Sequence, residues 1–397
     1  MKKIKIILSI ICLFIIYIYT AYITLLPNNI ILMESENYDI KNLFGVELIE
    51  STKTVNDNYN TSNIEVKLFG NVLLKNINIT TLEDISVVPV GKVIGLKLYT
   101  NGVLIVGKSE VEDINNNLTK PYEQSDIQEG DTILKVNNEN IDSIESLKKV
   151  VNNSKGKNLE LTILRNGTTL TSNITPIQSK SNDYKLGLWV KDAATGVGTM
   201  SFYEPISKSF AVLGHGITDS DTDSLINIDY GELVTSRVIS IEKAKSDKPG
   251  EIKGTILNQQ TIGKVSKNTQ FGIYGTLENL TSLNIDTSKA MKVALRDEIE
   301  VGKAKILCSL DNSNKTEEYE IEIEKIYFDN DYNNKSMLIR ITDEKLIEKT
   351  GGIIRGLSGA PIIQNEKLVG AVTNVLVSNP EIGYGIFADL MIKELKK

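Results

Sequence analysis

The sequence predicts a mainly β protein with one N-terminal transmembrane helix, a small α+β unit and a larger unit built from β-strands. Three observations carry this prediction. An uncharged apolar run occupies residues 6–26, a strand–helix–hairpin pattern occupies residues 90–178, and short apolar runs separated by Gly, Asn and Asp fill residues 180–397. With 397 residues, the chain is long enough for two or three domains.

The N-terminal segment, residues 1–27, has the features of a membrane-spanning helix. Three lysines precede an apolar run of about 20 residues, the length that crosses a bilayer core as a helix. The positive charge before the run predicts that the N-terminus stays inside and the bulk of the chain lies outside. The alternative is a cleavable signal peptide, whose apolar core is typically shorter, about 7–15 residues. The length of this run favours an uncleaved signal-anchor.

Charge and composition narrow the classes of function. The formal net charge is −7, so the chain lacks the basic character of a nucleic-acid-binding protein, and we expect no nucleic-acid partner. The two cysteines, Cys12 and Cys308, form no CxxC or Cys/His cluster, which argues against a zinc or redox site. His215 is the only histidine, so chemistry that needs an imidazole has one candidate. We therefore expect no metal and no cofactor.

Residues 28–89 form a juxtamembrane region that is rich in Asn, Thr and Ile. The stretch Ile64–Phe69 alternates apolar and polar residues, which is the pattern of a half-buried strand. Val72–Ile77 alternates less cleanly. We expect a small region that contains strands.

Residues 90–178 show the plan of a compact α+β unit. Gly130–Asn137 is a turn that leads into a strand, and Ser143 suits the N-cap of a following helix, with Ser146 at the capping-box position. Asn166-Gly167 predicts a tight hairpin turn, because both residues tolerate positive φ. The apolar residues on one face of the expected helix are Ile144, Leu147, Val150 and Val151.

The unit of residues 180–397 contains many short apolar runs, which are typical of a β-barrel or a β-sandwich. Ser358 lies here in a glycine-rich segment, where a tight turn can project its hydroxyl. The amides of Gly356 and Ser358 could converge on a developing oxyanion, and such donors are typically worth ~3 kcal/mol each.

A serine hydroxyl becomes a good nucleophile when a neighbouring base takes its proton. His215 lies between two glycines directly after an apolar run, and the glycines allow it to approach another loop closely. A third group should orient the imidazole. Asp343, after a predicted strand and ahead of the serine, and Asp219, shortly after the histidine, are both candidates, and spacing alone does not choose between them.

The α+β unit resembles a PDZ domain of the bacterial-protease kind. The resemblance rests on Gly-Asp-x-Ile-x-x-Val-Asn at 130–137, on the helix after it, and on Gly-Lys-x-Ile-Gly at 91–95. It implies that an extended peptide binds by strand addition. It also implies that amides near Ile94, Gly95 and Leu96 hold a terminal carboxylate.

Most of the chain resembles the stage IV sporulation protein B peptidase family of spore-forming bacteria. The segment Gly356–Pro361 is also similar to the serine loop of chymotrypsin-like peptidases. The family resemblance implies a chymotrypsin-like β-barrel serine peptidase domain at 180–397, with His215, Asp343 and Ser358 as the catalytic set. The motifs that carry it are Leu188–Asp192, Gly196–Phe202, Phe210–Gly216, Thr342-Asp343, Thr350–Gly352, Gly356–Pro361, Val369–Thr373 and Gly383–Ile386.

The resemblance further implies a role in sporulation. Such peptidases are membrane-anchored endopeptidases of the space between the two forespore membranes. They cut themselves near the N-terminus, here between about Pro27 and Val90, and then cleave a membrane-bound regulatory protein, which triggers sigma-factor activation. The PDZ domain would bind the protein's own N-terminal segment or the partner.

One departure from the family is visible, because Asn374 stands where the family often has a histidine after Ala-Val-Thr. His215 therefore has no rival as the base. Two other functions remain open at this point. One is an envelope quality-control protease with a PDZ domain, and the other is a catalytically inactive scaffold.

Overall fold

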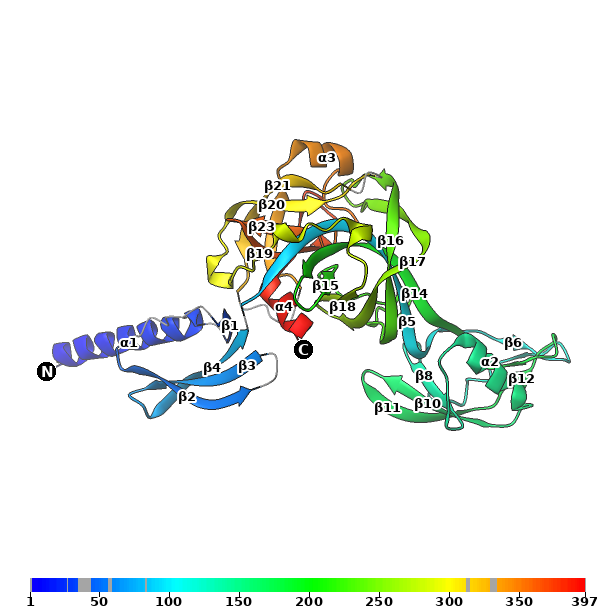
Figure 1. The fold of residues 1–397 in the computed structure, drawn as a ribbon. Coiled ribbons are helices and arrows are strands. Elements are labelled where there is room, and N and C mark those ends of the chain that lie inside the picture. Colours follow the sequence, from blue (N-terminus) through cyan, green and yellow to red (C-terminus); the bar gives the residue numbers. More distant parts are fainter. Residues whose placement is uncertain are drawn as a thin grey trace.

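The computed structural model describes residues 2–26, 28–34, 44–55, 59–82, 84–311, 315–328 and 334–396. As predicted, the protein is mainly β. An apolar helix and a small sheet lead into a body of two barrels, from which an α+β unit projects (Figure 1). Parts of two predictions lie outside the described residues. These are Met1 and Pro27 of the anchor segment, and residues 35–43, 56–58 and 83 in the region where self-cleavage is expected.

Helix α1 (Lys2–Leu25) contains the apolar stretch Ile6–Thr24, which has a mean hydropathy of 2.5 and is not buried. Its length and composition suit a membrane anchor or a signal sequence. A sheet of order β1-β4-β3-β2 follows, and Lys75 in this sheet donates to the carbonyl of Ile23 at 3.2 Å. The strands are β1 (Asn29–Met33), β2 (Val46–Val55), β3 (Tyr59–Leu68) and β4 (Val72–Leu82).

Six strands form the first barrel. They pair in the order β5-β14-β15-β18-β17-β16, and β16 pairs again with β5, so the ring closes. Buried aliphatic and aromatic side chains fill its interior, among them Ile94, Leu96 and Phe210. The strands are β5 (Ser86–Lys108), β14 (Leu188–Glu204), β15 (Ser209–Val212), β16 (Ile228–Glu242), β17 (Glu251–Thr269) and β18 (Gly272–Leu277).

The second barrel is closed in the order β20-β21-β22-β25-β24-β23. One large core contains side chains from both barrels, which joins them into a single body. The strands are β20 (Gly302–Cys308), β21 (Glu317–Ile326), β22 (Met337–Ile341), β23 (Pro361–Gln364), β24 (Lys367–Val375) and β25 (Ile382–Phe387). The other elements here are β19 (Met291–Lys292), three short 3-10 turns (Thr281–Leu283, Thr287–Lys289 and Arg296–Glu298), α3 (Glu344–Thr350) and α4 (Ala388–Lys396).

The α+β unit confirms the local predictions. Ser143 caps α2 (Ile144–Asn153) and forms a capping box with Ser146. Asn166 and Gly167 have φ values of 48° and 78° and connect two antiparallel strands. Beside the outer half of β5 the unit contains β6 (Val111–Glu112), β7 (Leu118–Thr119), β8 (Thr132–Val136), β9 (Glu139–Asn140), β10 (Leu159–Arg165), β11 (Thr168–Ile174), β12 (Ile177–Gln178) and β13 (Tyr184–Lys185).

Strands β5 and β14 belong to both the α+β unit and the first barrel. They pair antiparallel from Leu188 with Lys108 to Tyr203 with Val88, and Figure 1 shows them running together from the barrel into the unit. The α+β unit is therefore an insertion between two barrel strands. The boundary expected between residues 89 and 90 falls inside β5, and the first barrel takes one of its strands from before the insertion.

Candidate active site

His215 lies in the loop between β15 and β16, which we call the His loop (residues 213–227). Leu213 has a φ of 72°, and the N–H of Gly214 donates to the carbonyl of Val212, which makes a tight three-residue turn. A positive φ at a leucine is strained, at a cost of about 1–3 kcal/mol, and strain of this kind often occurs at functional sites. The turn redirects the chain at the barrel end immediately before His215.

The His loop is fastened to the barrel by Asn268 of β17. Its side-chain oxygen accepts from the N–H of Ile217 at 2.9 Å, and its side-chain nitrogen donates to the carbonyls of Ile217 and Ile226 at 2.9 and 2.8 Å. One amide side chain therefore joins the outgoing and the returning segment of the loop near its base.

The imidazole of His215 is held in one tautomer by the main chain. Its Nδ1 lies 2.8 Å from the carbonyl oxygen of Gly216. A carbonyl can only accept, so Nδ1 carries the hydrogen and Nε2 keeps a free lone pair. Burial lowers the pKa of His215 below its usual value, although the Gly216 carbonyl opposes this shift. The side chain is therefore neutral at pH 7, in the form that a general base requires.

Ser358 lies in the turn that precedes β23. Among the described residues, neither the N–H of Gly356 nor that of Ser358 donates a hydrogen bond, whereas the neighbouring amides of Arg355, Leu357 and Gly359 all do. The two amides predicted to stabilise an oxyanion are thus the two that are free. The Ser358 hydroxyl donates to the carbonyl of Thr373 at 2.7 Å, and no hydrogen bond joins it to His215.

The serine turn and the His loop are in van der Waals contact. A Cβ added to Gly359, whose φ is 95°, would lie 2.0 Å from the carbonyl oxygen of Thr199 and 2.6 Å from the nitrogen of Leu213. A Cβ on Gly214 would lie 3.1 Å from a methyl group of Thr373. The lone histidine and the predicted nucleophile therefore come from loops of different barrels that meet between them.

Thr199 of β14 fixes the serine turn from the first barrel. Its hydroxyl donates to the carbonyl of Gly356 at 2.6 Å, and its N–H donates to the carbonyl of Ser358 at 3.1 Å. Its own carbonyl accepts from the N–H of Leu213 at 3.2 Å, so this buried residue contacts both loops. A hollow of about 320 Å³ opens beside Gly356, between Gly196-Val197 and the start of β17.

The structure does not bring Asp343 to His215. Asp343 is the N-cap of α3, where one oxygen accepts from the N–H of Leu346 at 3.0 Å and the other from the N–H of Glu320 at 3.3 Å. Asp219 lies in the His loop, but its oxygens accept from Lys191 and from the amides of Asp221 and Thr222. Within the described chain the imidazole is oriented by the Gly216 carbonyl, with no carboxylate bonded to it.

The expected carboxylate-binding residues Ile94, Gly95 and Leu96 lie elsewhere than predicted. They form the middle of β5 in the first barrel, where β14 occupies one edge and β16 the other. Ile94 and Leu96 are buried in the barrel core. Because both edges are occupied, these residues cannot receive a peptide strand, so this prediction is wrong.

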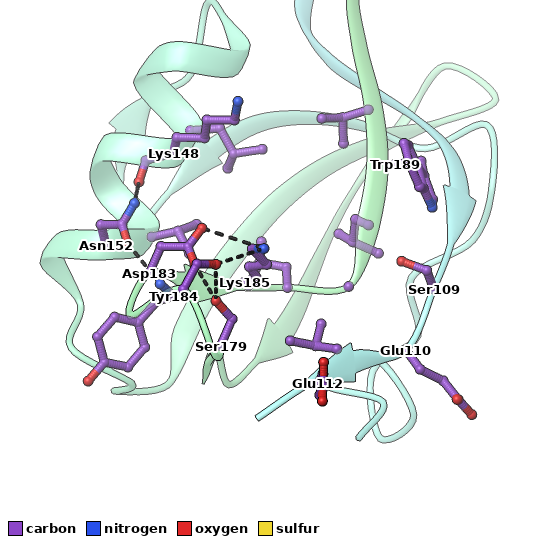
Figure 2. A pocket seen from close by; sticks show the side chains of 18 of the residues that line it. Ser109, Glu110, Glu112, Lys148, Asn152, Ser179, Asp183, Tyr184, Lys185 and Trp189 are labelled. Carbon is purple, nitrogen blue, oxygen red and sulfur yellow. Dashed lines mark hydrogen bonds and ion pairs between the residues drawn. The ribbon is translucent and has the colours of Figure 1, made fainter. Parts of the chain in front are cut away.

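The α+β unit has its groove between α2 and the first residues of β14. The groove has a volume of about 600 Å³, and Figure 2 shows Lys148 and Asn152 of α2 on one side and Trp189 of β14 on the other. In the described chain, no strand pairs with the edge of β14 that faces α2, and the amides of Leu186 and Gly187 donate no hydrogen bond. The groove therefore offers a free strand edge and free amides.

Comparison with protein families matches two parts of the chain. The SpoIVB peptidase S55 family matches residues 182–392, and the PDZ domain family matches residues 94–175. The chain belongs to the SpoIVB peptidase S55 family. It is therefore a serine peptidase that carries a PDZ domain. Comparison with curated proteins gave no match.

Sequence reasoning missed several residues that hold this peptidase site. Thr199 and Asn268 donate side-chain hydrogen bonds to main-chain carbonyls of loops that are distant in sequence, and the main-chain carbonyl of Thr373 accepts from the Ser358 hydroxyl. Thr199 lies within the motif Gly196–Phe202 and Thr373 ends the motif Val369–Thr373, whereas Asn268 had no local signal. Asn374 follows Thr373 in β24, and its side-chain oxygen is buried without a hydrogen bond in the described chain.

Proposed function

We propose that this protein is a membrane-anchored serine endopeptidase of sporulation in which Ser358 is the nucleophile and His215 the general base. The observation that carries the proposal is the contact between the two loops, with the base in its accepting tautomer and two free amides beside the serine. The family supplies the reaction class.

In the proposed mechanism, the Ser358 hydroxyl turns from Thr373 and attacks the carbonyl carbon of a substrate peptide bond. Its proton passes to Nε2 of His215, and the amides of Gly356 and Ser358 hold the oxyanion. His215 then gives the proton to the leaving amine. Water hydrolyses the acyl-enzyme by the same route in reverse.

The PDZ groove would receive an extended peptide as a strand beside Leu188–Val190, with its terminal carboxylate at the amides of Leu186 and Gly187. The proposed ligands are the protein's own N-terminal segment and the membrane-bound regulatory protein that it cleaves. Two features support this, namely the apolar helix α1 at one end of the chain and the free groove edge.

The biological role proposed is self-cleavage near the N-terminus in the space between the two forespore membranes. Cleavage of the membrane-bound regulator and sigma-factor activation would follow. The test is mass spectrometry of N-termini for wild type and Ser358→Ala, each co-expressed with candidate membrane substrates. We expect a new N-terminus before about Val90 in wild type alone. The same N-termini in both proteins would overturn the proposal.

A further inference from the structure

Two consecutive residues of β14 connect the PDZ domain with the His loop. The ammonium group of Lys191 donates to Asp219 at 2.9 Å and to Asp221 at 2.5 Å, and both aspartates belong to the His loop. The carboxylate of Asp192 accepts from the N–H of Ile144 at 2.8 Å, at the N-terminus of α2. The two adjacent side chains therefore contact two different elements.

The pair lies where the barrel ends and the PDZ domain begins. The register between β14 and β5 shifts between Lys191 and Ala193, and Gly102 on the facing part of β5 has a φ of 95°. A register shift interrupts the regular ladder of hydrogen bonds, so side chains contribute more to fixing the two parts at this point. Lys191 and Asp192 make their contacts at this break.

Asp219 organises the tip of the His loop. One oxygen accepts from the amides of Asp221 and Thr222 at 3.0 and 3.2 Å, while the other accepts from Lys191. Asp219 is buried, whereas Lys191 is half-exposed. A buried carboxylate needs a charged partner, so loss of the lysine would release the tip rather than leave it in place.

The PDZ domain also approaches this tip closely. A Cβ added to Gly130, in the turn before β8, would lie 3.4 Å from the hydroxyl oxygen of Ser224 and 3.9 Å from Thr222. The His loop is therefore held at its base by Asn268 of the barrel and at its tip by the PDZ side.

We propose that Lys191 is a positioning residue of the peptidase site and that, together with Asp192, it couples the PDZ groove to His215. This inference rests on the proposed function of His215 and of the groove. The groove is lined by β14 as far as Val190, and the next residue is Lys191. A peptide that pairs with β14 in this groove and packs on α2 fixes the backbone that carries both side chains.

The experiment is a double-mutant cycle on the full chain. Lys191→Met removes the contact to the His loop, and Asp192→Ala removes the contact to α2. The readouts are the rate of covalent labelling of Ser358 by a fluorophosphonate and the hydrogen exchange of residues 216–226. Lys264→Met, which removes a surface contact to Glu278 in the same barrel, is the matched control.

We expect Lys191→Met to slow labelling by roughly tenfold to a hundredfold and to raise exchange across the His loop. Asp192→Ala should slow labelling less, and it should have no further effect in the Lys191→Met background. Lys191→Arg should restore most of the rate because it keeps both ion pairs, and Lys264→Met should match wild type.

Additive effects of Lys191→Met and Asp192→Ala would overturn the coupling, as would failure of Lys191→Arg to restore the rate. Unchanged hydrogen exchange of residues 216–226 in Lys191→Met would overturn the positioning role, whether or not the protein is active. Absence of labelling in wild type would instead count against the proposed function. The two failures are therefore distinguishable.

Discussion

Asp343 occupies the N-cap of α3, and this position gives a clear test of its role. Asn is as good an N-cap as Asp, so Asp343→Asn removes the charge and keeps the cap. Because neither oxygen reaches His215, we expect fluorophosphonate labelling of Ser358 to proceed close to the wild-type rate. Loss of an orienting carboxylate would instead slow the reaction by about 10⁴-fold, and that result would support the predicted catalytic role of Asp343.

The control for this variant is Asp343→Ala, which removes the cap itself. It should lower stability by about 1 kcal/mol, measured as a decrease in Tm, because the amide of Leu346 loses its acceptor. A lower Tm in Asp343→Ala together with an unchanged Tm in Asp343→Asn would identify capping as the role of this side chain.

The roles of single residues could be predicted where a few neighbouring residues in the sequence mark them. Ser143 and Ser146 form the expected capping box because capping depends on three or four consecutive residues. His215 and Ser358 stood out because each lies among glycines. The carbonyl of Gly216, which holds the imidazole, is a main-chain group that every residue has, so no sequence pattern marks it.

At the scale of elements, the contact between the serine turn and the His loop depends on Gly359. In Gly359→Ala the new methyl would meet the Thr199 carbonyl at 2.0 Å, and the backbone has a φ of 95° that alanine rarely adopts. We expect the two loops to separate and labelling of Ser358 to decrease by on the order of 10²-fold, with the barrels still folded by circular dichroism.

Gly167→Ala is the matched control for this substitution. Gly167 has a φ of 78°, which also strains an alanine, but a Cβ there meets no atom within 4 Å. The control should therefore lose some stability and keep the wild-type rate of labelling. Equal effects of the two substitutions on labelling would show that close approach of the loops is not what Gly359 provides.

Strand β5 shows that the sequence predicts a strand but not the strands with which it pairs. The continuous apolar run at 103–106 is typical of a buried strand and lies in β5, but a strand pattern does not reveal its partners. The resemblance assigns the segment Gly91–Gly95 to the PDZ domain, whereas its pairing with β14 and β16 makes it part of the barrel. Pairing with residues about 100 or more positions away in the sequence therefore determines that this segment belongs to the barrel.

At the scale of the whole molecule, the insertion of the PDZ domain predicts which fragments fold. Residues 180–397 include the unit that composition suggests, but they lack β5, which lies between β14 and β16 in the first barrel. Without β5, both neighbouring strands have a free edge. We expect residues 180–397 to aggregate or remain unfolded, and residues 84–397 to unfold cooperatively when monitored by circular dichroism. A stable, monomeric 180–397 fragment would contradict this assignment of β5.

The central claim is that the lone imidazole activates the serine of the other barrel. Its most direct test is the rate of fluorophosphonate labelling at Ser358 as a function of pH, in wild type and in His215→Gln. Protonated imidazole cannot accept the serine proton, and burial lowers the pKa of His215. Wild type should therefore keep its full rate at pH 7 and lose it only below about pH 6.5. Labelling of Ser358 in His215→Gln should be slower than in wild type by about 10³-fold or more at every pH above about 6.5. Equal rates in the two proteins, or no labelled Ser358 in folded wild type, would contradict the account.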